Sequence, residues 1–267
     1  MSFAYQTLAG LKSLARQIQA ERSLPHHQAL DLAARHGGFA GYVEAKRKLP
    51  EKRESRFKVT VRQNWWGYES KDGGTAEIAL HFRTSLLELI RPHHLTGYFG
   101  ACKLRSAQII ERSGQQRHAD ETCWYIGRIA RALQFMDATG LKPSEARRRY
   151  PEGDWDCRPP VADHDHTWYD PEARIHLLST EPYPGRSDRS ADAQADWERK
   201  HGWATFYVNW GGIYGNGTEL ILCCPQAYAD TLQRKIAHLE ASPSAVEDSD
   251  VAIHTSPSVS SRRTMIV

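Results

Sequence analysis

Carboxylates and imidazoles gather in one stretch of the chain that could bind a metal ion. Residues 163–166 read Asp-His-Asp-His, and in an extended segment His164 and His166 point to the same side. That spacing offers two nitrogen ligands to one ion, and a third ligand such as Asp170 would leave a position for water. The other candidates for the third ligand are His176 and Cys157. A divalent metal and a hydrolase or lyase reaction follow from this interpretation, whereas a solvated polar loop is the alternative.

Asparagine and tryptophan recur together at two places, residues 64–66 and 209–210, that could line a cleft. Flat aromatic rings stack on bases, sugars or peptide side chains, and basic strand residues beside them would suit nucleic acid. The alternative is that the asparagines are turn residues and the tryptophans belong to the core. The candidate ligand-binding residues are Asn64, Trp65, Trp66, Asn209, Trp210, Lys58 and Arg62.

Charge is distributed unevenly along the chain. Residues 1–60 contain eleven Lys and Arg against five Asp and Glu, whereas residues 151–200 have an acidic excess. Clustered cations favour binding to phosphates, although a charge run can also be only a linker. The candidate nucleic-acid-binding residues are Lys46, Arg47, Lys48, Lys52 and Arg53.

The elements that would position these basic residues are three short helices in residues 1–50. Leu8, Leu11, Leu14 and Ile18 recur at three- and four-residue steps, which aligns an apolar stripe on the first helix. Pro25 opens the second helix, a Gly-Gly pair ends it, and residues 39–49 form the third. Residues 51–56 are expected to be a linker.

The run over residues 8–49 resembles a short helical module that precedes glyoxalase-like domains in some bacterial proteins. The same module heads uncharacterised proteins of bacterial mobile elements. The residues that carry the resemblance are Lys12, Leu14, Ala15, His27, Gln28, Ala29, Leu30, Leu32, Ala33, Gly38 and Phe39, with Tyr42 where the pattern usually has Trp. The rest of the chain lacks the glyoxalase pattern of metal-binding residues, so the resemblance implies a bacterial accessory protein without that chemistry.

Residues 57–241 are predicted to form an α+β body. A two-residue period and an Asp-Gly-Gly turn indicate a hairpin over residues 57–82, and a second hairpin covers 203–224. We expect an inserted helical segment between them, over residues 84–150. Shared Asn-Trp, Gly-Thr and Glu positions make 57–92 and 203–241 similar β-hairpin–α units that could pair into one sheet; chance similarity of turns is the alternative. The Ser-rich tail, 242–267, is expected to be disordered.

Bulk properties exclude several classes of protein. The 267 residues are 40% hydrophobic and 25% charged, which is unlike collagen, disulfide scaffolds or fully disordered chains. A transmembrane helix is not expected, because there is no apolar run of about 18 residues. Five cysteines without a CxxC motif fit a reducing cytoplasm.

The function expected from these patterns is binding rather than catalysis. We expect a soluble bacterial protein that binds nucleic acid or a partner protein through its basic helical module and an aromatic-lined cleft. No cofactor is required by that interpretation. The alternative is the metal-dependent hydrolase or lyase centred on residues 163–166.

Overall fold

The computed structural model confirms a mixed α+β fold with helices at the N-terminus. It describes residues 8–22, 24–49, 57–67, 72–114, 118–146, 150–185, 191–215 and 217–256. The expected linker at 51–56, with Lys52 and Arg53, lies outside the described residues.

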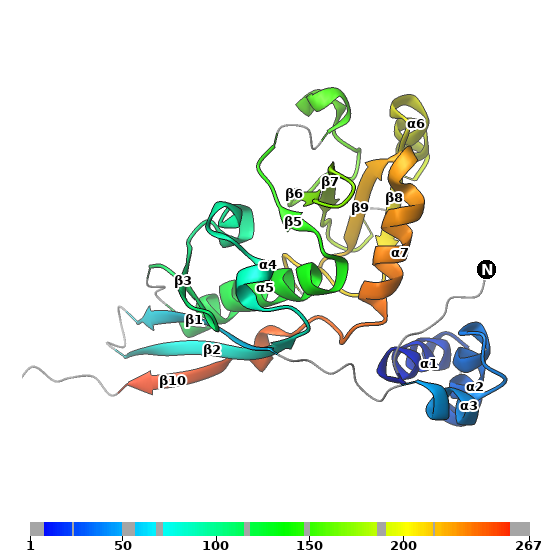
Figure 1. The fold of residues 1–267 in the computed structure, drawn as a ribbon, viewed down its shortest axis with the longest axis horizontal. Coiled ribbons are helices and arrows are strands. Elements are labelled where there is room, and N and C mark those ends of the chain that lie inside the picture. Colours follow the sequence, from blue (N-terminus) through cyan, green and yellow to red (C-terminus); the bar gives the residue numbers. More distant parts are fainter. Residues whose placement is uncertain are drawn as a thin grey trace, which may run out of the picture.

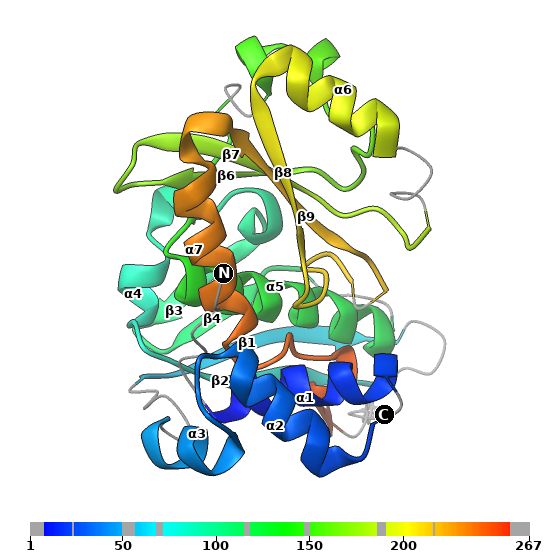
Figure 2. The same ribbon diagram turned by 90° about the vertical axis from the view of Figure 1, so that its right-hand side faces the viewer.

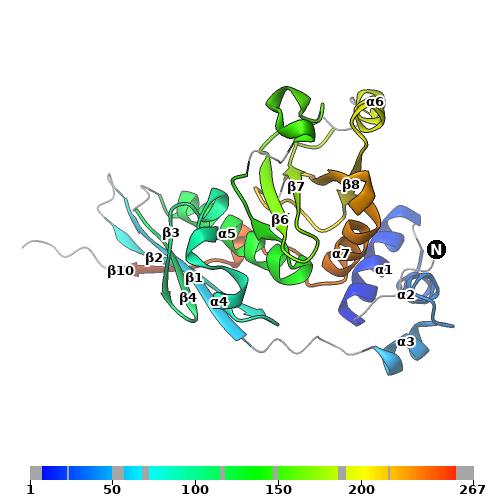
Figure 3. The ribbon, with the colours of Figure 1, turned by 45° about the horizontal axis from the view of Figure 1, so that its top comes forward.

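Three helices form an N-terminal module with its own small core: α1 (Leu8–Arg22), α2 (His26–His36) and α3 (Tyr42–Lys48). Alanines dominate the buried face of α2, so the helices can lie close together. The module meets the rest of the molecule where α1 lies beside the end of α7 (Ala229–Glu240) (Figures 2 and 3). A Cβ on Gly10 would lie 3.0 Å from the Cα of Ala241, so glycine permits this close contact.

The first sheet has five strands and contains the first predicted hairpin. In spatial order its strands are β10 (Ala252–Ser256), β2 (Gly73–Phe82), β1 (Phe57–Trp66), β4 (Ile109–Arg112) and β3 (Cys102–Ser106). The expectation of a helical segment over residues 84–150 is therefore wrong for residues 102–112, which contain strands β3 and β4. Cys102 and Ile110 are buried on the core face, and so short a segment matches a strand as well as a helix.

The expectation of a disordered tail is also wrong for residues 252–256, which pair with β2 as strand β10. The side chains of residues 252–255 are exposed, so this strand is held by backbone hydrogen bonds that a hydropathy pattern does not reveal. The body thus extends past residue 241, while residues 257–267 lie outside the described part of the chain.

The second sheet contains the second predicted hairpin. Its strands, in spatial order, are β5 (Lys142–Pro143), β6 (His166–Asp170), β7 (Ile175–Thr180), β9 (Leu220–Pro225) and β8 (Trp203–Val208). The two hairpins therefore do not share one sheet, which contradicts the proposed pairing of duplicated units. The register differs as well, because Trp65 pairs with Gly74 inside the first ladder whereas Trp210 follows the end of β8.

Helix α5 (Ala119–Thr139) lies between the two sheets, as Figure 1 shows. A single apolar core joins both sheets to α5 and to α7 (Ala229–Glu240). The outer face of the second sheet is covered by α6 (Ala191–His201), whose Trp197 packs in a smaller core. Short helices complete the described elements: α4 (Leu86–Leu89), η1 (Pro92–His94), η2 (Gly97–Phe99), η4 (Pro151–Gly153), η5 (Trp155–Cys157), η7 (Gln226–Tyr228) and η8 (Asp248–Asp250).

Among the helices of the described residues, none has both the length and the apolar character required to cross a bilayer.

Candidate functional site: an arginine among aromatic rings

Helix α5 carries the residue around which the site is built. The helix follows His118 and stops at Gly140, whose φ of 73° is left-handed and suits glycine. Trp124, Tyr125 and Arg128 are separated by three and four residues, so they share one side of the first helical turns. All three side chains are partly buried, whereas Ile126 and Ile129 of the same helix are fully buried.

The guanidinium of Arg128 is surrounded by four aromatic rings from three segments. Its Cζ atom lies 4.8 Å from the ring centroid of Trp124, 5.2 Å from Tyr98 of η2, 5.6 Å from Tyr125 and 5.6 Å from Tyr214, which lies between β8 and β9. A cation within about 6 Å of a ring face is attracted by the ring quadrupole. The fold therefore holds one positive charge in an aromatic cage.

Arg128 has no hydrogen-bond acceptor among the described residues. Its Nε atom is buried without a partner, and no carboxylate of that part of the chain forms an ion pair with it. Burial lowers the pKa of this guanidinium, although an arginine stays charged at neutral pH. A half-buried cation with unused donors is costly for a protein to maintain unless an external anion binds there.

A second arginine lies on the same cage. The Cζ atom of Arg112, at the end of β4, lies 3.7 Å from the centroid of Tyr125, and its charge contributes to the lowered pKa of Arg128. Two guanidinium groups thus share one tyrosine. Two positive charges beside one ring favour an anionic ligand.

A buried carboxylate fixes two of the rings. Glu181 accepts hydrogen bonds from the Tyr98 hydroxyl at 2.6 Å, the Tyr214 backbone N–H at 2.7 Å and the Thr218 hydroxyl at 3.2 Å. Burial raises the pKa of Glu181, while these hydrogen bonds lower it; burial also raises the pKa of Tyr98, with the neighbouring Glu181 adding to the effect. Glu181 therefore orients Tyr98 and Tyr214 on two sides of the cation.

The two histidines of the predicted metal site lie against the same rings. His164 has a left-handed φ of 50°, so the segment is not extended there, and its ring stacks on Tyr214 at 3.7 Å. His166 packs against Tyr98 at 4.3 Å between ring centroids. Gly97 is required here, because a Cβ on it would overlap the His166 ring. The histidines support the aromatic cage from two sides.

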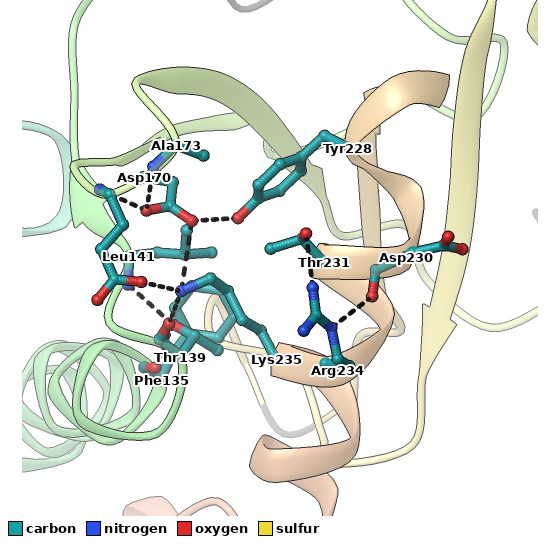
Figure 4. A network of polar contacts seen from close by, with 11 residues as sticks. Phe135, Thr139, Leu141, Asp170, Ala173, Tyr228, Asp230, Thr231, Arg234 and Lys235 are labelled. Carbon is teal, nitrogen blue, oxygen red and sulfur yellow. Dashed lines mark hydrogen bonds and ion pairs between the residues drawn. The ribbon is translucent and has the colours of Figure 1, made fainter.

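Asp170 belongs to a different network (Figure 4). Its carboxylate accepts a short hydrogen bond from the Tyr228 hydroxyl and pairs with Lys235 at 3.3 Å. Burial raises the pKa of Asp170, but the hydrogen bonds and the lysine outweigh burial, so the pKa is lowered. The network ties β6 to α7, and Lys235 also donates to the carbonyl oxygen of Thr139 at the end of α5.

The structure therefore does not bring His164, His166 and Asp170 together as ligands of one metal ion. His166 and Asp170 are four strand residues apart, which places them roughly 13 Å from each other along β6. Within the described residues, the only three potential ligands whose donor atoms lie within 4.8 Å of one another are Glu152, Cys157 and His201.

The predicted tryptophan cleft is not formed. Trp65 and Trp210 are each 8% exposed and belong to the central core, so the alternative of core tryptophans holds for both. The indole N–H of Trp210 donates to the carbonyl oxygen of Pro243, while Trp66 is exposed. Trp65 and Trp210 therefore contribute to the packing of the core.

The polar residues beside those tryptophans have local roles. Asn64 accepts a hydrogen bond from the Thr75 hydroxyl across the first hairpin, and the backbone N–H of Asn209 donates to Glu240. Arg62 forms an ion pair with Glu111 at 2.9 Å. Lys58 is exposed on β1.

The described basic residues of the N-terminal module, Lys46, Arg47 and Lys48, are exposed on α3. Lys48 pairs with Glu44, and Arg47 lines a hollow with Asp31 and Glu44. The positive charge of this helix is therefore partly offset by nearby carboxylates.

Comparison with protein families, curated proteins and solved structures gave no match.

Sequence reasoning missed Arg128, Tyr98, Tyr214 and Glu181. The one local signal is the spacing of Trp124, Tyr125 and Arg128, which would place two rings and a cation on one helix face. The other members come from distant segments that only the fold brings together.

Proposed function

We propose that the protein binds a single-stranded nucleic acid, with Arg128 contacting a phosphate group and the neighbouring rings stacking on bases. The observation that carries this proposal is the half-buried guanidinium of Arg128, which has no protein acceptor among the described residues and lies within a cage of aromatic rings. Phosphate oxygens supply the acceptors that this group lacks.

The chemistry of the cage favours nucleic acid over a simple anion. Trp124, Tyr125 and Tyr214 are only partly buried, so part of each side chain remains accessible. Proteins that bind single strands combine cations that follow the backbone with rings on which bases stack. Arg112 adds a second cation beside Tyr125.

Other expectations enter the proposal as supporting contacts. Lys46, Arg47 and Lys48 would add sequence-independent contacts with phosphates, because their side chains are exposed on α3. All five cysteines are free thiols, which supports a location in the reducing bacterial cytoplasm.

Fluorescence anisotropy with end-labelled oligothymidylate and oligouridylate tests the proposal. We expect binding at low salt that weakens as salt is added, because counterions released from the phosphates oppose binding. Arg128→Met should weaken binding by about tenfold to a hundredfold, since a charged hydrogen bond contributes about 1.5–3 kcal/mol. Tyr214→Ala should weaken it through the loss of about 1–3 kcal/mol of stacking.

Arg199→Met is the matched control. Arg199 is exposed on α6 and pairs with Asp196, so this variant loses the same charge without touching the cage. Equal weakening by Arg128→Met and Arg199→Met would show that only overall charge matters and would contradict the proposal. Failure of both oligonucleotides to bind at low salt would also contradict it and would favour a partner protein as the ligand.

A further inference from the structure

A second group of side chains with ligand chemistry lies at the opposite side of the second sheet from α5. Glu152 of η4, Cys157 of η5 and His201 at the end of α6 bring a carboxylate, a thiol and an imidazole together. Their donor atoms all lie within 4.8 Å of one another, and His201 Nδ1 is 4.0 Å from Glu152 Oε1. Three separate segments therefore converge on one point.

Trp197 holds two of these ligands in place. Its indole N–H donates to the carbonyl oxygen of Cys157 at 2.8 Å, and its ring lies 5.6 Å from the ring of His201, one helical turn further along α6. Trp197 itself is buried in the small core with Trp203. The side chain of His201 is only 5% exposed, whereas that of Glu152 is 78% exposed. Two ligands are thus fixed and the third is free to adjust.

The donor set suits an ion of intermediate softness. Sulfur, imidazole nitrogen and carboxylate oxygen are the three ligand types that Zn²⁺ binds, with bonds that place neighbouring donors about 3.3–3.6 Å apart in a tetrahedron. The group must contract by about 1 Å to reach that geometry, and rotation of the exposed Glu152 side chain can supply much of this movement.

Electrostatics support a cation at the same point. The carboxylates of Glu152 and Asp154 place negative charge near the Cys157 thiol, and the cation of Lys200 partly offsets it. A divalent ion would compensate this negative charge and favour the thiolate.

We propose that Glu152, Cys157 and His201 bind one divalent transition-metal ion of the zinc class, with the remaining coordination position open to water or a ligand. This site shares no residue with the aromatic cage around Arg128. A failed test of one proposal therefore leaves the other unaffected.

Metal titration of the untagged full-length protein, stripped with a chelator, tests this site. Co²⁺ should bind with a stoichiometry of one and give a sulfur-to-metal charge-transfer band together with the visible bands of tetrahedral cobalt. Zn²⁺ should displace the cobalt and abolish both signals. Cys157→Ser should eliminate the charge-transfer band, and Glu152→Gln should weaken binding while leaving the band in place.

Controls separate loss of a ligand from loss of the fold. Glu152 is exposed, so Glu152→Gln is expected to fold normally, and circular dichroism of each metal-free variant verifies this. Cys123→Ser removes a thiol outside the group and should keep the wild-type spectrum. Trp197→Phe should lower metal affinity by about tenfold to a hundredfold, because it removes the hydrogen bond that holds the Cys157 segment.

The proposal is overturned by absence of cobalt binding, or by a charge-transfer band that survives in Cys157→Ser. Equal affinity in the wild type and in a folded Glu152→Gln or His201→Gln variant would also remove that residue from the ligand set.

Discussion

Arg128 and Arg131 lie one turn apart on α5, yet their surroundings differ completely. Arg131 is fully buried and donates to the carbonyl oxygens of Ile213 and Val246 and to the carboxylate of Asp248. Arg128 donates to no described residue and contacts aromatic rings instead. The same residue type is thus used once to join segments and once to present a charge.

The difference shows what each arginine can contribute. Arg131 connects α5 to the loop after β8 and to the segment that leads into β10, so its hydrogen bonds stabilise the fold. The rings around Arg128 attract the cation but accept no conventional hydrogen bond from its Nε atom. The proposed binding role therefore belongs to Arg128, and the stabilising role to Arg131.

The largest expected effect is the loss of stability in Arg131→Met. Removing one partner of a buried ion pair costs about 3–5 kcal/mol, and we expect about 3 kcal/mol because the Asp248 side chain is 32% exposed. Urea unfolding followed by circular dichroism measures the change. Arg199→Met, an exposed control, should shift the free energy of unfolding by less than about 0.5 kcal/mol. A loss of similar size in both variants would mean that Arg131 does not join the segments.

Much of the fold that surrounds these arginines could be predicted from the sequence. The period-two pattern and the Asp-Gly-Gly turn predicted the first hairpin correctly, and α5 lies within the helical segment predicted over residues 84–150. Cys223 and Cys224 face the two cores on opposite sides of β9, as alternation in a strand requires. Strong periodicity over a long segment is what makes such predictions succeed.

Other elements have sequence patterns that are too weak to predict them. Strands β3 and β4 have only five and four residues, too few for a clear two-residue period, and β10 has exposed side chains at residues 252–255. The division into two sheets depends on pairing between strands that are distant in sequence, which similar turn residues do not determine. The predicted site failed for the same reason: it relied on neighbours in sequence, whereas Arg128, Tyr98 and Glu181 meet only in the folded chain.

Glu181→Gln should change how stability depends on pH. Because burial raises the pKa of Glu181 in the folded state, the wild type should lose stability as the pH rises from the ordinary value of 4.5 through the raised pKa. Glutamine does not titrate, so the variant should lack this decrease of the free energy of unfolding with rising pH. At pH 4.5 the variant should be about 2 kcal/mol less stable than the wild type. The NH₂ group of glutamine cannot accept the hydrogen bonds that Tyr98, Tyr214 and Thr218 donate at this position.

Urea unfolding at a series of pH values measures both effects. The difference in the free energy of unfolding between the wild type and Glu181→Gln should become smaller as the pH rises. Parallel pH profiles would contradict a raised pKa for Glu181 and would weaken the view that this carboxylate orients the rings around Arg128.

Gly127→Ala adds one methyl group to α5 and tests whether the Asp248 carboxylate that pairs with Arg131 is held against this helix. Alanine favours helix over glycine by about 1 kcal/mol, but a Cβ at this position would overlap the Asp248 carboxylate that binds Arg131. We expect a net loss of about 1 kcal/mol in the wild type. In an Asp248→Ala background the overlap with the carboxylate is absent and only a 3.0 Å contact with the flexible end of the Arg131 side chain remains, so the same substitution should become stabilising. If Gly127→Ala changed the free energy of unfolding in the same direction in both backgrounds, Asp248 would not be fixed against α5.

The smallest effect on stability is expected for Arg128→Met. This variant tests directly whether Arg128, unlike Arg131, is dispensable for the fold. The variant loses cation–π attraction of about 0.5–2 kcal/mol but no longer buries a cation without an acceptor, so the two contributions nearly cancel. The free energy of unfolding should stay within about 1 kcal/mol of the wild type, while the magnitude of the slope of log affinity against log salt for single-stranded oligothymidylate should decrease by about 0.7. If Arg128→Met were instead as unstable as Arg131→Met, both arginines would serve the fold, and a ligand at the aromatic cage would lose its main support. An unchanged salt slope would show that no phosphate reaches this guanidinium.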